Sequence, residues 1–226
     1  MNALVPASFR RQAGRMYAGF AFGRLAPLYR VLTAHEAWRR SCRELGALVP
    51  GPLVLDLGMG PGDGALEMAR ADPSRRHVGV DLSAAMVSRA ARAAAAAGAA
   101  LRPVRADGLA LPVREGAFDG VTAHSYLYLV PDPLAALAEA RRALRPGGRL
   151  ALLEPREGPL DVRGALSCGA RGAASMLLWR SMSRLHRRFT EDALATLLEA
   201  AGFGDVGVRP ALAGFGVLAT GARPAP

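Results

Sequence analysis

Residues 53–64, with the sequence LVLDLGMGPGDG, constrain the fold of this chain more than any other segment. The segment begins as an apolar run typical of a buried strand, contains Asp56, and continues into a loop in which every second residue is glycine. Glycine adopts positive φ without strain and lets backbone N–H groups approach a ligand closely. Residues 65–71 read as a helix, and the free amides at its start favour negative charge. Strand, glycine loop and helix together predict a nucleotide-type site in an open α/β sheet.

The rest of the chain continues this alternation of strands and helices. Two β-like segments at the end, 206–209 and 215–219, are expected to form an antiparallel pair. We therefore predict an α/β fold with a Rossmann-like seven-stranded, mostly parallel sheet, helices on both faces and a terminal antiparallel hairpin. The other predicted strands are 53–56, 77–81, 101–105, 118–123 and 149–153, and the predicted helices are 62–71, 83–97, 132–144 and 190–201.

The length of 226 residues fits a single domain spanning 1–226. Within it we expect an N-terminal helical cap at 1–49, a cofactor-binding core at 50–155, a helical lid or substrate wall at 156–188, and a terminal helix and hairpin at 189–226.

The formal net charge of +10 suggests nucleic acid or an anionic membrane as a partner. The chain contains no lysine, however, so its many arginines reflect a bias of the whole composition. One asymmetry is independent of that bias, because residues 1–35 hold five arginines and no Asp or Glu. This segment is interpreted as a cap over the cofactor, with peripheral membrane contact as the alternative.

No apolar run approaches the length that spans a bilayer, and Arg10, Arg11 and Arg15 interrupt any secretory signal. The two cysteines, Cys42 and Cys168, have no metal-type spacing, and ordinary thiols in a reducing compartment are favoured over a disulfide. We expect a cytoplasmic protein without a metal site.

Two acidic residues follow predicted strands at the same edge as the glycine loop. Asp81 ends the second strand, 25 residues after Asp56, where a carboxylate accepts hydrogen bonds from ribose hydroxyls. Its alternative role is at the start of the helix that Ser83 caps. Asp107 follows the third strand. Its carboxylate is expected to accept a hydrogen bond from the adenine amino group of a nucleoside ligand, or else to form an Asx-type turn.

Five motifs in this order carry a family resemblance: VLDLGMGPG, GVDLS, RADGLALP, FDGVTAHSYLYLVPDP and ALRPGGRLALLEP. They cover about residues 50–155, and the later segment FTEDALATLLEAAGF also matches. The glycine spacing is G-x-G-x-G, whereas a dinucleotide loop reads G-x-G-x-x-G. The chain resembles the class I S-adenosylmethionine-dependent methyltransferases, most closely the type 11 small-molecule branch with the menaquinone and ubiquinone biosynthesis enzymes.

The resemblance implies S-adenosylmethionine as cofactor and assigns residues to it. The three glycines of the loop would pack against the methionine and ribose, Asp81 would hold the ribose, and backbone after the fourth strand would meet the methionine end. The cofactor-binding residues implied are Tyr29, Asp56, Gly58, Gly60, Gly62, Asp81, Leu82, Asp107, Gly108, Ala123 and His124.

The chain departs from the quinone-pathway pattern at two places. Arg30 replaces the acid that commonly follows the position of Tyr29, and Tyr128-Leu129 stands where those enzymes carry an Arg-Asn pair. The segment 123–126, AHSY, also differs from the Asp/Asn-Pro-Pro-aromatic motif of enzymes that methylate nucleic-acid bases, which disfavours a nucleic-acid substrate.

Methyl transfer needs alignment of the acceptor more than acid–base chemistry, but a hydroxyl or carbon acceptor benefits from a general base. His124 is the candidate base, and His186 either enters the pocket or lies on the surface. Tyr126, Trp179 and Met182 are candidate substrate contacts, and they suggest a small lipophilic or aromatic acceptor methylated at oxygen or carbon. A non-methylating S-adenosylmethionine-binding protein and a nicotinamide-dependent oxidoreductase are the alternatives.

Overall fold

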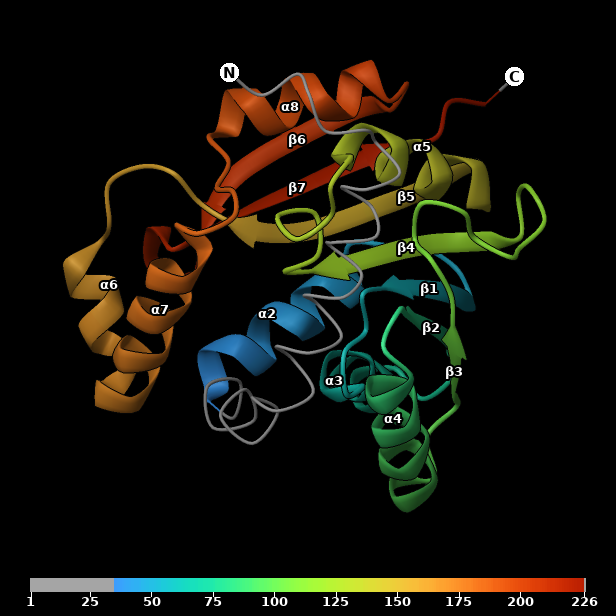
Figure 1. The fold of residues 1–226 in the computed structure, drawn as a ribbon, viewed down its shortest axis with the longest axis horizontal. Helices are drawn as coiled ribbons and strands as arrows, with labels where there is room; N and C mark the ends of the chain where they lie inside the picture. The colour runs from blue at the N-terminus through green and yellow to red at the C-terminus, as the bar shows by residue number, and fades with distance from the viewer. Residues whose placement is uncertain (1–34, 226) are drawn as a thin grey trace, which may run out of the picture.

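The structure, a computed structural model, describes residues 35–225 and is built on one seven-stranded sheet (Figure 1). Its strand order is β3-β2-β1-β4-β5-β7-β6. The first five strands are parallel, and β7 runs antiparallel to both β5 and β6, which confirms the predicted sheet and hairpin. The strands are β1 (Leu53–Leu57), β2 (Arg76–Asp81), β3 (Leu101–Arg105), β4 (Phe118–His124), β5 (Leu144–Pro155), β6 (Gly204–Ala211) and β7 (Gly216–Ala222).

Helices cover both faces of this sheet (Figure 1). On one face lie α2 (Glu36–Ala47), α3 (Asp63–Ala71) and α4 (Ala84–Ala97), and on the other α5 (Pro133–Ala143) and α8 (Glu191–Ala200). Two further helices, α6 (Val162–Ser167) and α7 (Gly169–Ser183), lie beyond the carboxyl ends of β4 and β5.

The strand order reverses between β1 and β4. From β1 the chain steps outward to β2 and β3, returns to β4 beside β1, and then steps the other way to β5. Because such parallel crossovers are right-handed, the two directions of travel place their helices on opposite faces. The carboxyl ends of β1 and β4 therefore border a crevice, which is where open α/β sheets bind ligands.

Alternate residues of β5 bury against different layers. Leu150 and Leu152 pack into the large core formed with α5 and α8. Ala151 and Leu153 face the opposite side, where they pack with Leu45 of α2. This period of two, on a strand that is apolar on both faces, is expected of a central strand covered by helices on both sides.

The helix boundaries follow the local signals in the sequence. The Ser83 side chain accepts a hydrogen bond from Met86 N, and Gly98 ends α4 in the left-handed conformation with φ 58°. Asp132 accepts from Ala135 N, with Pro133 at the first helical position of α5. These caps satisfy backbone groups that a helix end leaves without partners, and they confirm the predicted ends of both helices.

Three features differ from the prediction. The helices α2 and α6 lie in segments for which no helix bounds were predicted. Strand β5 begins at Leu144 rather than at residue 149, because a register shift lets Leu144 pair with Phe118 before regular pairing resumes at Gly120. The turn between β6 and β7 is a short 3-10 helix, η1 (Leu212–Gly214), in which Leu212 and Ala213 hold positive φ.

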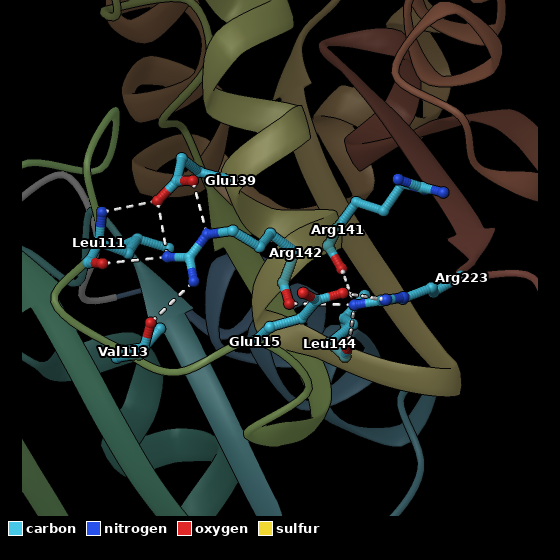
Figure 2. Close-up of polar contacts among 8 residues, drawn as sticks. All are labelled: Leu111, Val113, Glu115, Glu139, Arg141, Arg142, Leu144 and Arg223. Carbon is cyan, nitrogen blue, oxygen red and sulfur yellow. Dashed lines mark hydrogen bonds and ion pairs between the residues drawn. The ribbon is translucent and has the colours of Figure 1, made fainter.

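Two arginines, Arg142 and Arg223, donate hydrogen bonds to backbone carbonyls around the end of α5 (Figure 2). The Arg223 guanidinium donates to the carbonyls of Arg141, Arg142 and Leu144, where α5 ends. Arg142 in turn donates to Glu139 and to the carbonyls of Leu111 and Val113. A cation at a helix C-terminus also opposes the negative end of the helix dipole.

Both cysteines are free thiols, as expected. Among residues 35–225, no helix is long and apolar enough to cross a bilayer. The basic segment 1–35, with its two alternative roles, lies outside the described residues apart from His35.

Replacing Arg223 with alanine should lower the free energy of unfolding by about 2 kcal/mol, because three carbonyls at the end of α5 lose a charged donor. Urea unfolding followed by circular dichroism measures this change. The matched variant Arg114→Ala, at an exposed arginine, should stay within about 0.5 kcal/mol of the parent chain. Equal losses for the two variants would contradict the role given to Arg223.

Candidate active site

The glycine loop after β1 lies at the carboxyl edge of the sheet. Gly58, Gly60 and Gly62 all hold positive φ, at 64°, 56° and 91°. A Cβ placed on Gly60 would meet nothing within 4 Å, so this part of the loop faces open space. Met59 N donates to Val80 O at 3.0 Å, which joins the loop to the end of β2. The loop thus offers its backbone to a ligand.

Asp81 organises the loop and the next helix together. Its Oδ2 accepts from Gly60 N at 3.0 Å, and its Oδ1 accepts from Ser83 N at 2.8 Å. Burial raises the pKa of this carboxyl, and the two backbone hydrogen bonds oppose that rise. The alternative role at the start of the helix is therefore present, and Leu82 lies in the chain between Asp81 and Ser83. A carboxylate oxygen accepts more than one hydrogen bond, so a ligand hydroxyl can still reach it.

Asp107 forms the Asx-type turn that was the alternative to an adenine contact. Its Oδ1 accepts from Leu109 N at 3.0 Å, and Ala110 N donates to its carbonyl. The turn fixes the backbone of Gly108 at the carboxyl end of β3.

Asp56 is buried beneath the loop. Thr122 Oγ1 donates to its Oδ1 at 2.9 Å. Burial raises the pKa of Asp56 to about 7; the Thr122 hydrogen bond lowers it and the nearby Asp81 raises it further. Asp56 and His124 both line a narrow cavity of about 20 Å³ between the glycine loop and α2. Burial disfavours the charged form of Asp56, and a cation placed beside the carboxylate would stabilise that charged form.

His124, the last residue of β4, has both ring nitrogens in hydrogen bonds. Ser41 Oγ donates to Trp38 O at 2.7 Å, so its oxygen must accept the proton of His124 Nε2 at 3.1 Å. The Nδ1 atom then accepts from Ser125 Oγ at 2.9 Å. Burial lowers the pKa of His124 to about 4, which keeps the ring neutral near pH 7. General base catalysis by His124 stays a prediction, and this low pKa makes it a weak base.

Aromatic rings surround His124. The Trp38 ring of α2 lies 5.5 Å from it between centroids, and the Trp179 ring of α7 lies 6.4 Å away. The segment 156–188 therefore reaches the carboxyl end of β4 through Trp179. We call Trp38, His124 and Trp179 the aromatic cluster.

The other predicted site residues lie outside this cluster. Met182 is half-buried on α7, and His186 is exposed with its ring against Tyr128, 5.9 Å between centroids. Ala123 is buried in β4, next to Leu57 of β1. Tyr29 lies outside the described residues.

Tyr126, predicted as a substrate contact, packs against the glycine loop and against the turn after β3. Its ring atom Cδ2 would come within 2.6 Å of a Cβ on Gly58, and its Oη within 1.9 Å of one on Gly108. The side chain therefore spans two of the glycines that the resemblance assigned to the cofactor.

Sequence reasoning missed Trp38, Ser41 and Glu154. Trp38, Ser41, Cys42 and Leu45 form the buried face of α2 at helical spacing, a signal that residues 36–47 contain. Glu154 interrupts the apolar run of β5 near its carboxyl end, as Asp56 does in β1. Glu154 is fully buried and accepts from the backbone N–H groups of Tyr126, Leu127 and Tyr128.

Comparisons with known proteins agree with this geometry. The family described as "Methyltransferase domain" matches residues 54–148. The demethylmenaquinone methyltransferase of Thermus thermophilus is 35% identical over 227 residues, which cover 90% of this chain and all of that protein. The ubiquinone/menaquinone biosynthesis C-methyltransferase of Paracoccus denitrificans is 29% identical, covering 94% of both chains. The crystal structure of the cyclase SpnF has a TM-score of 0.69 at 22% identity, covering 92% of this chain and 96% of the other, and shows the fold alone.

The fold and the rim of the sheet are those of a class I methyltransferase. The chain belongs to the S-adenosylmethionine-dependent methyltransferases of the menaquinone and ubiquinone type. S-adenosylmethionine is its cofactor. The chain is therefore a methyltransferase, rather than a nicotinamide-dependent oxidoreductase or a non-methylating protein. The positive-φ glycines, the open space at Gly60 and the half-buried Asp81 carboxylate fit that cofactor.

Replacing Asp81 with alanine should weaken S-adenosylmethionine binding at least tenfold, about 1.4 kcal/mol, because both the carboxylate and its hold on Gly60 N are lost. Isothermal titration calorimetry measures the affinity. Asp205→Ala, at an exposed acid near the far edge of the sheet, is the matched control and should bind as the parent chain does. An unchanged affinity for Asp81→Ala would contradict the assignment.

Asp56 should make stability depend on pH in a specific direction. Its folded pKa of about 7 exceeds the unfolded value near 3.9, so the folded chain binds the proton more tightly and stability falls as pH rises from about 4 to about 7. Asp56→Asn keeps an oxygen that accepts from Thr122 but carries no charge. Without ligand, this variant should be more stable than the parent above about pH 7 by up to about 4 kcal/mol, with the difference vanishing near pH 4. Urea unfolding across this range tests it, and a constant difference would refute the buried charge.

Proposed function

We propose that this chain transfers the methyl group of S-adenosylmethionine to a carbon or oxygen atom of a small, lipophilic, aromatic acceptor of the quinol type. Relatives named for demethylmenaquinone and for 2-phytyl-1,4-naphtoquinone support this acceptor class. The observation that carries the proposal is the aromatic cluster, which combines Trp38, His124 and Trp179 at the end of the strand beside the glycine loop. Flat aromatic acceptors gain stacking and edge contacts from such rings.

The cofactor is assigned to the rim formed by β1, β2, β3 and β4. In this proposal Gly58, Gly60 and Gly62 contact its methionine and ribose, and Asp81 accepts from the ribose hydroxyls. Gly108 lies beside the adenine. Asp56, buried under the loop, adds a carboxylate near the positively charged methionine end. Leu82, Asp107, Ala123 and the backbone of His124 complete the set.

The bound cofactor supplies an electrophilic methyl group with a good leaving group, so the chain itself contributes alignment and exclusion of water. Trp38 and Trp179 hold the plane of the acceptor, and the segment 156–188 acts as a wall over it. His124 is neutral and already donates to Ser41. Its role in the proposal is to orient the acceptor, and it accepts a proton through Nδ1 only when the Ser125 hydroxyl turns away or passes the proton on.

The acceptor is expected to differ in detail from those of the quinone relatives. Tyr128 occupies the position of their arginine and lies buried, with its N–H donated to Glu154. Its uncharged ring packs against His186, whereas an arginine would carry a positive charge here. An acceptor held by aromatic contacts rather than by a cationic side chain fits this change.

Incubation of the full chain with S-adenosylmethionine and a reduced prenylated 1,4-naphthoquinone should yield a product with one added methyl group, detected by mass spectrometry and located on carbon or oxygen by NMR. Trp179→Ala should lower kcat/KM for this acceptor by about tenfold or more through lost ring contact, with cofactor affinity unchanged. Trp179→Phe keeps a ring and should retain most of the activity. Absence of product with any aromatic acceptor, or equal kcat/KM for Trp179→Ala and the parent, would contradict the acceptor assignment.

A further inference from the structure

The Tyr126 side chain fills space at the carboxyl edge of the sheet that the cofactor needs. It extends from Gly58, after β1, to Gly108, after β3, and leaves no room for a Cβ on either glycine. The charges of Asp107, which follows β3, and of Asp81, at the end of β2, both act on its phenol group. These residues define the same path that the nucleoside of the cofactor is assigned to follow.

The hydroxyl of Tyr126 has no polar partner in this position. Its oxygen is fully buried and without a hydrogen bond, although carboxylates lie nearby. Burial raises the pKa of this hydroxyl above its ordinary value, and the acidic neighbours add to the rise. An unsatisfied buried hydroxyl is costly. Packing of the ring, rather than a hydrogen bond of its hydroxyl, therefore holds the Tyr126 side chain in this position. A ligand that packs into the same space can replace the ring.

The backbone beneath Tyr126 is held in place. Glu154 accepts from the N–H groups of Tyr126, Leu127 and Tyr128 at 2.9, 2.7 and 3.2 Å. Ser125 precedes them with φ at 59°, a conformation that favours glycine, and its N–H donates to Leu153 O at 2.8 Å. A change at this point thus occurs by rotation of the Tyr126 side chain rather than by movement of the loop.

We propose that Tyr126 gates the S-adenosylmethionine site: its ring occupies the site in the cofactor-free chain and rotates out when the cofactor enters. This inference rests on the assignment of the rim to the cofactor and is independent of the acceptor. The closed state lowers the apparent affinity by the fraction of molecules that are open, so an open fraction of about one tenth weakens binding about tenfold.

Two substitutions at this position should act in opposite directions. Tyr126→Ala removes the ring, so S-adenosylhomocysteine should bind about tenfold more tightly. Tyr126→Phe keeps the ring and removes the unsatisfied hydroxyl, so the closed state gains stability. This variant should unfold at a higher temperature and bind S-adenosylhomocysteine more weakly than the parent chain. A residue that merely contacts the cofactor would lose affinity when cut to alanine.

Calorimetry of the parent and both variants with S-adenosylhomocysteine gives the affinities, and 19F NMR of the full chain labelled with 3-fluorotyrosine reports the ring directly. The chain has four tyrosines, and the signal absent in Tyr126→Phe is that of Tyr126. Adding S-adenosylhomocysteine should shift this signal toward that of an exposed tyrosine.

Weaker binding by Tyr126→Ala, or a Tyr126 signal that does not respond to the ligand, overturns the gate while leaving the cofactor assignment standing. No binding of S-adenosylhomocysteine by the parent or by Tyr126→Ala overturns both. Should Tyr126→Ala not fold, the weaker binding expected of Tyr126→Phe and the 19F signal still decide the matter.

Discussion

The pairing of β1 with β4 is the constraint on which the site depends. These strands are separated by β2 and β3 in the sequence but are neighbours in the sheet, with Leu57 opposite Ala123. Their helices leave toward opposite faces, so the two strands end at a crevice of the kind in which open α/β sheets bind ligands. The glycine loop, Asp81 and His124 meet there because three parallel strands end at the same edge. Every chemical role proposed for the chain uses that edge.

Buried polar groups are concentrated around this crevice, and they divide into two kinds. The Asp81 and Glu154 carboxylates each accept backbone N–H groups and thereby fix the loops after β1 and β4. Burial raises the pKa of both Asp56 and Glu154 to about 7, but Asp56 accepts from the side-chain hydroxyl of Thr122 rather than from backbone N–H groups. The first kind shapes the backbone, whereas Asp56 lines the small cavity between the glycine loop and α2. His124 is a third case, because burial lowers its pKa and two serine hydroxyls occupy its ring nitrogens.

Much of the fold could be predicted because its signals are local. Apolar runs, the caps at Ser83 and Asp132, and Gly98 each act within a few residues, so sequence reasoning placed the corresponding elements closely. The early start of β5 could not be read from sequence, since Leu144 joins the strand only through a register shift against Phe118. For the site, strand-end acids and glycines were found by position. Trp38 and Ser41 were not, because they reach His124 from a helix far away in the sequence.

The sequence by itself determined the class of the chain, the cofactor and the rim residues that follow β1, β2 and β3, because these depend on short motifs with fixed spacing. The tertiary structure alone decided which side chains share that rim. It placed Tyr126 between Gly58 and Gly108, Trp179 beside His124, and Glu154 under the loop after β4. It also set the pKa values of Asp56 and His124. The physical reason is the same in each case. Packing brings together residues that are far apart in the chain, and a local sequence pattern does not specify which of them come into contact.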